Sequence, residues 1–97
     1  PSLLEGNTAV FKPSEDTPAV GQRLVELFHE AGFPAGTVNL VHGAGETGEA
    51  LVKNPGVNVL LFTGSYDVGR RIQEVSASMH DRLVAAGMGG KNAIIVC

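Results

Sequence analysis

The chain has 97 residues, enough for one domain at most, and its hydrophobic content of 43% is enough for a core and excludes a disordered tail. A net charge of −3 argues against a surface that binds nucleic acid or an acidic membrane. The single cysteine excludes an internal disulfide and favours a reducing compartment. The apolar runs all fall short of the roughly 18 residues that span a bilayer.

Both ends of the sequence predict a piece of a longer protein. The chain begins with Pro1, and Glu5 and Gly6 interrupt the first apolar residues, so we expect no signal peptide. Residues 93–97 form an apolar run that is typical of a buried strand with nothing after it. The longer protein expected from these features is called the parent below.

The first predicted β–α unit occupies residues 8–32. A short strand over residues 8–12 is followed by a helix that Thr17 is expected to cap, with Pro18 at the first helical position that proline favours. Gly32 is expected to end this helix. The apolar residues predicted to form its buried face are Val20, Leu24, Leu27, Phe28 and Ala31.

Two further β–α units follow, with glycines between strand and helix in each. A strand over residues 37–41 leads through a glycine-rich segment, residues 43–48, into a short helix predicted for residues 49–53. The next strand, residues 57–62, ends before Gly64, and Ser65 is expected to cap the third helix. The apolar residues of that helix recur at the spacing of one buried face, at Val68, Ile72, Val75 and Met79. A fourth strand is predicted for residues 83–85 and a last one for residues 93–97.

Strands separated by helices of this length predict β–α–β crossovers, and hence an α/β fold with a mostly parallel sheet covered on both faces. Ligands of such sheets lie beyond the carboxyl ends of the strands. This rule predicts that residues 12–15, 43–48 and 64–65 lie along one edge of the sheet, at the carboxyl ends of its strands. The turn at Gly64 and Ser65 would present backbone N–H groups at a helix start, which is an anion site. Taken alone, the turn is better explained as an ordinary connection between strand and helix.

Four sequence strings, in this order and spacing, give the chain its resemblance to a known family. They are residues 6–15 (GNTAVFKPSE), 31–39 (AGFPAGTVN), 62–65 (FTGS) and 89–92 (GGKN). With them the chain resembles the coenzyme domain of NAD(P)-dependent aldehyde dehydrogenases, and residues 88–96 are most similar to the 1-pyrroline-5-carboxylate dehydrogenase branch. The resemblance implies a Rossmann-like, three-layer α/β fold, with residues 1–88 as part of the coenzyme domain and residues 89–97 as the start of the link into a catalytic domain.

The resemblance also implies roles in binding the cofactor. Lys12 and Glu15 would hold the adenosine ribose, and a carboxylate at Glu15 would accept hydrogen bonds from a free 2′-hydroxyl but repel a 2′-phosphate, which favours NAD over NADP. Without the resemblance, a solvated pair at a strand end would be the better interpretation of these two residues.

The second group of cofactor residues implied by the resemblance surrounds the pyrophosphate and the adenine. Gly64 and Ser65 would hold the pyrophosphate, and Val68 would form one wall of the adenine site. Gly45 and Gly48 would form the other side, where missing side chains let the backbone approach the ligand. The spacing of these glycines differs from the usual Gly-x-Gly-x-x-Gly pattern, and turn geometry alone would also explain them.

No catalytic residue of the family is expected in this chain. The general-base glutamate of the family would stand two residues before the Gly-Gly-Lys string, where this sequence has Gly87. Cys97 lies too close to that string to be the nucleophilic cysteine and is interpreted as a small buried hydrophobe. The three histidines have no ligand spacing, so no metal site is predicted, and surface roles are expected for His29, His42 and His80.

The sequence therefore predicts the NAD-binding part of an enzyme that oxidises an aldehyde or semialdehyde to a carboxylic acid. The chain alone is expected to be inactive. Two alternatives stay open: a fragment of a CoA-acylating semialdehyde dehydrogenase, which the glycine at position 87 would suit, and a non-catalytic binding or structural remnant. The expected partners are NAD and, in the parent, a small aldehyde, without nucleic acid or membrane. A homo-oligomeric parent is expected in the cytoplasm, or in the mitochondrial matrix of a eukaryote.

Overall fold

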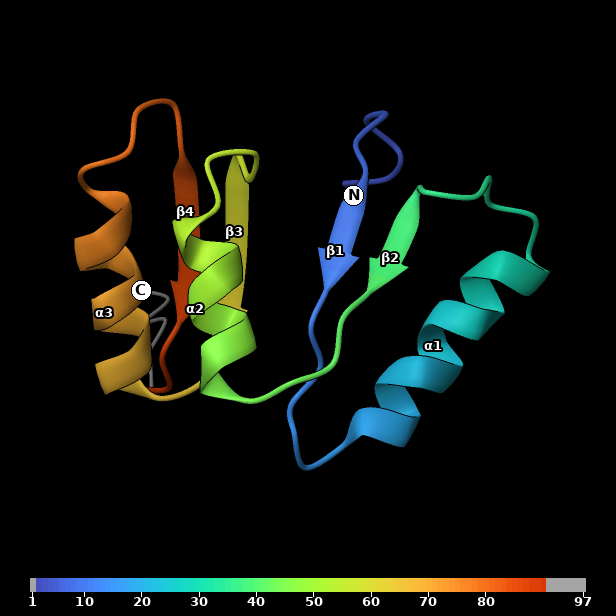
Figure 1. Ribbon diagram of the computed structural model, residues 1–97, viewed down its shortest axis with the longest axis horizontal. Coiled ribbons are helices and arrows are strands. Elements are labelled where there is room, and N and C mark those ends of the chain that lie inside the picture. Colours follow the sequence, from blue (N-terminus) through green and yellow to red (C-terminus); the bar gives the residue numbers. More distant parts are fainter. Residues whose placement is uncertain (1, 91–97) are drawn as a thin grey trace, which may run out of the picture. The chain divides into compact units, whose positions relative to one another are not determined.

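A computed structural model describes residues 2–90, and the chain divides into two units, residues 1–49 and 50–97, each of which is described by itself. The first unit contains β1 (Ala9–Phe11), α1 (Pro18–Glu30) and β2 (Val38–Leu40). The two strands are parallel, with Ala9 opposite Val38 and Phe11 opposite Leu40, and α1 packs against β2 (Figure 1). This is the first β–α–β unit that the sequence predicts.

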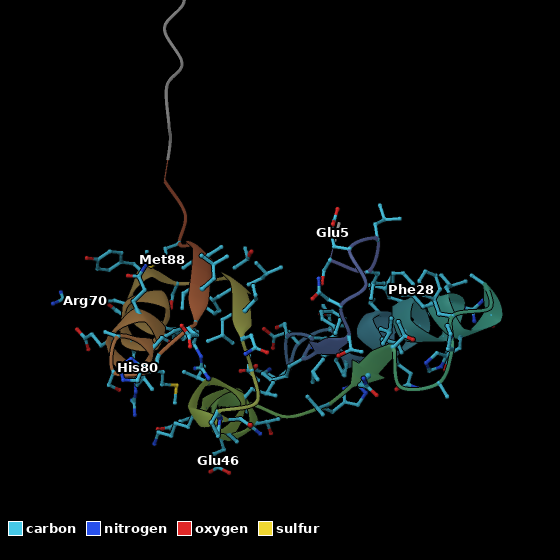
Figure 2. All side chains as sticks on the ribbon, turned by 90° about the horizontal axis from the view of Figure 1, so that it is seen from above. Glu5, Phe28, Glu46, Arg70, His80 and Met88 are labelled. Carbon is cyan, nitrogen blue, oxygen red and sulfur yellow. The ribbon has the colours of Figure 1, made fainter. Side chains whose placement is uncertain are left out.

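The core of the first unit lies between α1 and the strands. Val25 of α1 and Val38 of β2 are each 5% exposed. Gly21 lets α1 come close to the end of β1, because a Cβ atom at this position would lie only 2.5 Å from Cβ of the buried Pro13. Near the end of α1 the ring of Phe28, labelled in Figure 2, packs edge-to-face on Phe33 with 5.3 Å between the ring centroids.

The predicted buried face of α1 was wrong: among Val20, Leu24, Leu27, Phe28 and Ala31, only Phe28 is half-buried and the other four are exposed. Val20 is 70% exposed, and Leu24 and Leu27 are also exposed, whereas the buried positions are Gly21 and Val25. The helix has apolar residues on more than one side. The side that carries Gly21 faces the strands, because only a residue without a side chain fits beside Pro13. Thr17 occupies the N-cap position, but its side chain makes no capping hydrogen bond. Gly32, with φ of +95°, follows the last turn as predicted.

The second unit contains β3 (Val59–Thr63), α3 (Tyr66–Ser76) and β4 (Leu83–Gly87). These strands are also parallel, from Val59 opposite Leu83 to Thr63 opposite Gly87, and α3 packs against β4 (Figure 1). Exposed and half-buried residues alternate along both strands, as the two faces of a sheet require. The parallel pairing predicted from the sequence is confirmed in both strand pairs, while the strand predicted for residues 93–97 lies outside the described residues.

The helix α2 (Gly45–Lys53) begins in the first unit and ends in the second. The prediction that it starts at residue 49 was wrong, because its first turn includes Gly45 and Gly48, which were expected to be loop. Glycine disfavours a helix interior. Here Glu46 lies in the first turn, where a negative charge stabilises the helix dipole, and Figure 2 shows its side chain directed outward. Within residues 2–90, no helix is long and apolar enough to cross a membrane.

Candidate functional site

Lys12 follows directly on β1, and its ammonium group is held by two backbone carbonyls. Its Nζ donates to the oxygen of Gly43 at 2.8 Å and to that of Pro13 at 2.9 Å. The side chain is only 18% exposed. Lys12 is therefore not the solvated residue that the sequence alone favours. It fastens the end of β1 to the glycine-rich segment, residues 43–48, that follows β2.

Glu15 lies near this ammonium group but remains largely in solvent. Its Oε2 is 3.9 Å from the Nζ of Lys12, and its side chain is 61% exposed. A pair of this length and exposure contributes little to stability. An ammonium group has three N–H donors, and two of those of Lys12 are used by carbonyls. The third donor and the free oxygens of Glu15 can bind the hydroxyl groups of a ligand.

The glycine-rich segment has a different role at each of its glycines. Gly43 has φ of +150°, and a Cβ atom there would lie 2.6 Å from Cβ of Thr47, so only glycine fits. Gly45 faces open space, as expected for a position that a ligand could approach. A Cβ at Gly48 would lie 3.5 Å from Cε of Lys12. The space beside Gly48 is thus bordered by the lysine side chain.

In the second unit, the capped helix start predicted at Ser65 is confirmed. Ser65 has extended backbone angles, and its Oγ accepts a hydrogen bond from the N–H of Val68 at 3.4 Å. The N–H of Gly69 donates to the Ser65 carbonyl at 3.0 Å. Helix geometry leaves the N–H groups of Tyr66 and Asp67 without partners inside α3, so these two amides can serve an anion. The carboxylate of Asp67 in the same turn opposes that anion and is a feature the sequence reasoning missed.

The amide of Gly64 is not a free donor, which corrects one part of the predicted anion site. Its N–H donates to the carbonyl of Gly87 at 3.0 Å and so continues the pairing of β3 with β4. A side chain at this position would crowd the ring of Phe62, since a Cβ atom would lie 2.6 Å from its Cζ. Val68 is half exposed, as a wall of a ligand site has to be.

Gly87 ends β4 opposite Thr63, at an exposed position. No carboxylate stands there, and Cys97 lies outside the described residues. Among the residues that the structure describes, no group of three or more potential ligand side chains could hold a metal ion. His29 and His42 are exposed but have partners, the carbonyl of Val38 at 3.3 Å and the side chain of Gln22 at 3.1 Å.

An open cleft of about 580 Å³ lies between α1 and β2 in the first unit. Val25, Phe33 and Val38 give it apolar walls, and Gln22 and His42 are among its polar lining. None of the predicted cofactor residues lines it. In this unit, the cleft is thus separate from the predicted cofactor residues Lys12, Glu15, Gly45 and Gly48.

Two β–α–β units with parallel strands define an α/β protein. The sequence profile of the aldehyde dehydrogenase family matches residues 1–97, and the chain belongs to this family. It is 48% identical over 96 residues to the N-succinylglutamate 5-semialdehyde dehydrogenase of Vibrio cholerae serotype O1, covering 99% of this chain and 20% of the relative. The chain thus spans about one fifth of the length of the curated relatives it matches.

Solved structures of aldehyde dehydrogenases and of a related bifunctional protein also match this chain. A crystal structure of the bifunctional proline utilization A (PutA) protein matches 92% of this chain and 9% of its own with a TM-score of 0.87 at 38% identity. The Mycobacterium tuberculosis aldehyde dehydrogenase complexed with NAD+ matches 92% of this chain and 18% of its own with a TM-score of 0.86 at 42% identity. These likenesses confirm the expected family and the Rossmann-like fold class. The 1-pyrroline-5-carboxylate dehydrogenase branch stays a prediction.

Proposed function

We propose that this chain is the part of an NAD-dependent aldehyde dehydrogenase that binds the adenosine and pyrophosphate of the cofactor. Residues 1–88 belong to the coenzyme domain and residues 89–97 begin the link to the catalytic domain of the parent. The observation that carries the proposal is the ammonium group of Lys12, which two carbonyls hold in place with one donor left over. Membership of the family and the structural likeness to an aldehyde dehydrogenase complexed with NAD+ support it.

In the first unit, Lys12 donates to a hydroxyl of the adenosine ribose and Glu15 accepts from another. Gly45 offers an open backbone surface to the adenosine, and Gly48 leaves room for the lysine side chain beside it. Because the carboxylate of Glu15 repels a 2′-phosphate, the proposal favours NAD over NADP. In the second unit, Ser65 and the first amides of α3 take the pyrophosphate, Gly64 makes the turn, and Val68 contacts the adenine.

The parent oxidises an aldehyde or semialdehyde to a carboxylic acid, and the similarity to N-succinylglutamate 5-semialdehyde dehydrogenases favours a semialdehyde. NAD supplies the hydride acceptor. This chain binds and orients the cofactor, while the nucleophile comes from the catalytic domain. The comparisons give no support to the CoA-acylating or non-catalytic alternatives. A homo-oligomeric parent, and its location in the cytoplasm or in the mitochondrial matrix of a eukaryote, stay predictions.

ADP-ribose is expected to bind weakly to the 97-residue chain and to shift the amide signals of Gly45, Ser65 and Val68 in NMR spectra. Weak binding is expected because the nicotinamide contacts belong to the parent. Ser65→Ala should reduce the shifts, since the α3 cap loses its hydroxyl. Ser78→Ala is the matched control, because Ser78 lies just beyond the other end of α3 and its hydroxyl donates to the carbonyl of Val75 in the last turn. Shifts confined to the cleft between α1 and β2 would contradict the proposed site.

The isolated chain is expected to produce no NADH from an aldehyde, because it lacks both the nucleophile and the general base of the family. The assay uses the purified 97-residue chain with NAD and propanal or pyrroline-5-carboxylate, followed by absorbance of NADH. The control is Cys97→Ser, which should give the same blank result. Activity in the unmodified chain that disappears in Cys97→Ser would show that the interpretation of Cys97 is wrong.

A further inference from the structure

The first turn of α3 packs against two apolar side chains from other parts of the second unit. The first is Phe62 of β3. A Cβ atom at Gly64, before the turn, would lie 2.6 Å from Cζ of Phe62, and a Cβ atom at Gly69, at the end of the turn, would lie 3.3 Å from Cε1 of the same ring. The ring therefore contacts the turn at two positions that have no side chain.

The second side chain is that of Met88, which follows directly on β4 and is labelled in Figure 2. A Cβ atom at Gly69 would lie 2.5 Å from Cγ of Met88 and would also collide with its Sδ. The half-buried thioether thus occupies the space that a side chain at position 69 would fill, and Gly69 is buried. Methionine suits this place, because its flexible, unbranched side chain fills irregular gaps.

Gly69 also closes the helix start that the proposed function assigns to the pyrophosphate. Its N–H donates to the carbonyl of the N-cap residue Ser65 at 3.0 Å. The amides of Tyr66 and Asp67 lie between these two residues. A hydrogen bond weakens steeply as its angle bends, and the carboxylate of Asp67 in the same turn repels an anion. The two amides therefore have to be well aligned to bind a phosphate group.

We propose that Met88 is a positioning residue for the pyrophosphate of the cofactor, acting through Gly69. This inference rests on the proposed function, which assigns the pyrophosphate to Ser65 and the first amides of α3. The packing of Met88 adds to the cap that Ser65 forms. Its loss leaves a gap beside Gly69 and lowers the fraction of molecules in which the amides are aligned. Every residue on which the inference depends lies in the second unit.

The test is an NMR titration of the 97-residue chain with ADP-ribose, read at the amide signals of Ser65 and Val68 and combined with amide hydrogen exchange. Met88→Ala should speed exchange at Gly69. It should also raise the apparent Kd about three- to tenfold, which corresponds to about a third to a tenth of the molecules remaining competent. Met88→Leu keeps an apolar side chain of similar size and should restore most of the affinity.

Met79→Ala is the matched control. It truncates the same type of side chain at another half-buried position of the second unit, beyond the other end of α3, and should change neither exchange at Gly69 nor the Kd. Titrations are made below the melting temperature of each variant. An equal rise in Kd for Met79→Ala and Met88→Ala would contradict the proposal, because the effect would then be a general loss of stability.

The other outcomes separate this inference from the proposed function. If the unmodified chain does not bind ADP-ribose, the proposed function is overturned and the role of Met88 with it. If the unmodified chain binds and Met88→Ala has the same Kd, with faster exchange or a lower melting temperature alone, Met88 is merely structural and only this inference is overturned. If Met88→Ala does not fold, Met88→Val decides, with a partial loss of affinity expected and an unchanged Kd contradicting the proposal.

Discussion

In the parent enzyme, Gly87→Glu is expected to speed the steady-state oxidation of aldehyde and to abolish an initial burst of NADH. If Gly87 takes the place of the general base, the acyl-enzyme accumulates after hydride transfer, because water attacks the thioester without help. A positioned base contributes about 10²–10⁴-fold to the step that it serves. The burst and the steady phase are measured by stopped-flow absorbance of NADH.

The structure has room for a Cβ atom at position 87. Gly87 is exposed at the end of β4, and a Cβ atom would lie 3.7 Å from the carbonyl oxygen of Phe62 and from Oγ1 of Thr63, which is ordinary contact. A failure of Gly87→Glu would therefore not come from crowding at the first side-chain atom. Gly87→Gln is the matched control, since it has the same size and cannot act as a base.

Three results would distinguish the accounts of Gly87. A faster steady phase in Gly87→Glu but not in Gly87→Gln supports a hydrolytic enzyme that lacks its usual base. Turnover that stays dependent on CoA in both variants supports the CoA-acylating alternative. Rapid hydrolysis without CoA in the unmodified enzyme contradicts both, because another group then serves as the base.

The second large effect is expected for Gly43→Ala, which should destabilise the 97-residue chain. The φ of +150° at Gly43 is a conformation that other residues rarely adopt, at a cost of about 1–3 kcal/mol. The new methyl group would also collide with Cβ and Oγ1 of Thr47, and overpacking of this kind costs about 1–3 kcal/mol. The free energy of unfolding is measured by urea denaturation followed by circular dichroism.

Gly45→Ala is the control for this prediction, two residues further along the same segment. Its Cβ atom would face open space, and alanine in the first turn of α2 is no worse than glycine for helix formation. Gly43→Ala should also loosen Lys12, because the carbonyl that accepts its hydrogen bond belongs to Gly43. Equal urea midpoints for the two variants would show that Gly43 is not constrained as described.

The sequence predicts features set by neighbouring residues better than features set by distant ones. The start of α3 is predictable, because Ser65 and Val68 are three residues apart and form the cap by themselves. The partners of Lys12 are not, since its bond to Gly43 joins residues that β1 and β2 bring together. The partners of Arg82 are not predictable either. Its guanidinium group donates to backbone carbonyls that precede it in the sequence by 25 to 30 residues.

Where several local choices are possible, packing decides between them. The helix α1 offers apolar residues on more than one side, and the fit of Gly21 against Pro13 settles which side faces the strands. The start of α2 was misplaced because glycines indicate a loop, although Gly45 and Gly48 are tolerated in a first helical turn. A one-dimensional pattern does not contain these contacts.

The hydrogen bond from the N–H of Gly64 to the carbonyl of Gly87 joins the turn that we propose for the pyrophosphate to the position where the family resemblance places a general base, through main-chain atoms alone. Main-chain atoms are the same whatever the side chain, so a substitution at position 87 can alter the chemistry there while the turn keeps its anchor. If both proposed roles hold, a mutation at position 87 can change how an acyl intermediate is released without altering the turn that binds the pyrophosphate. Within one scaffold, hydrolytic and non-hydrolytic variants would be neighbours separated by a single residue.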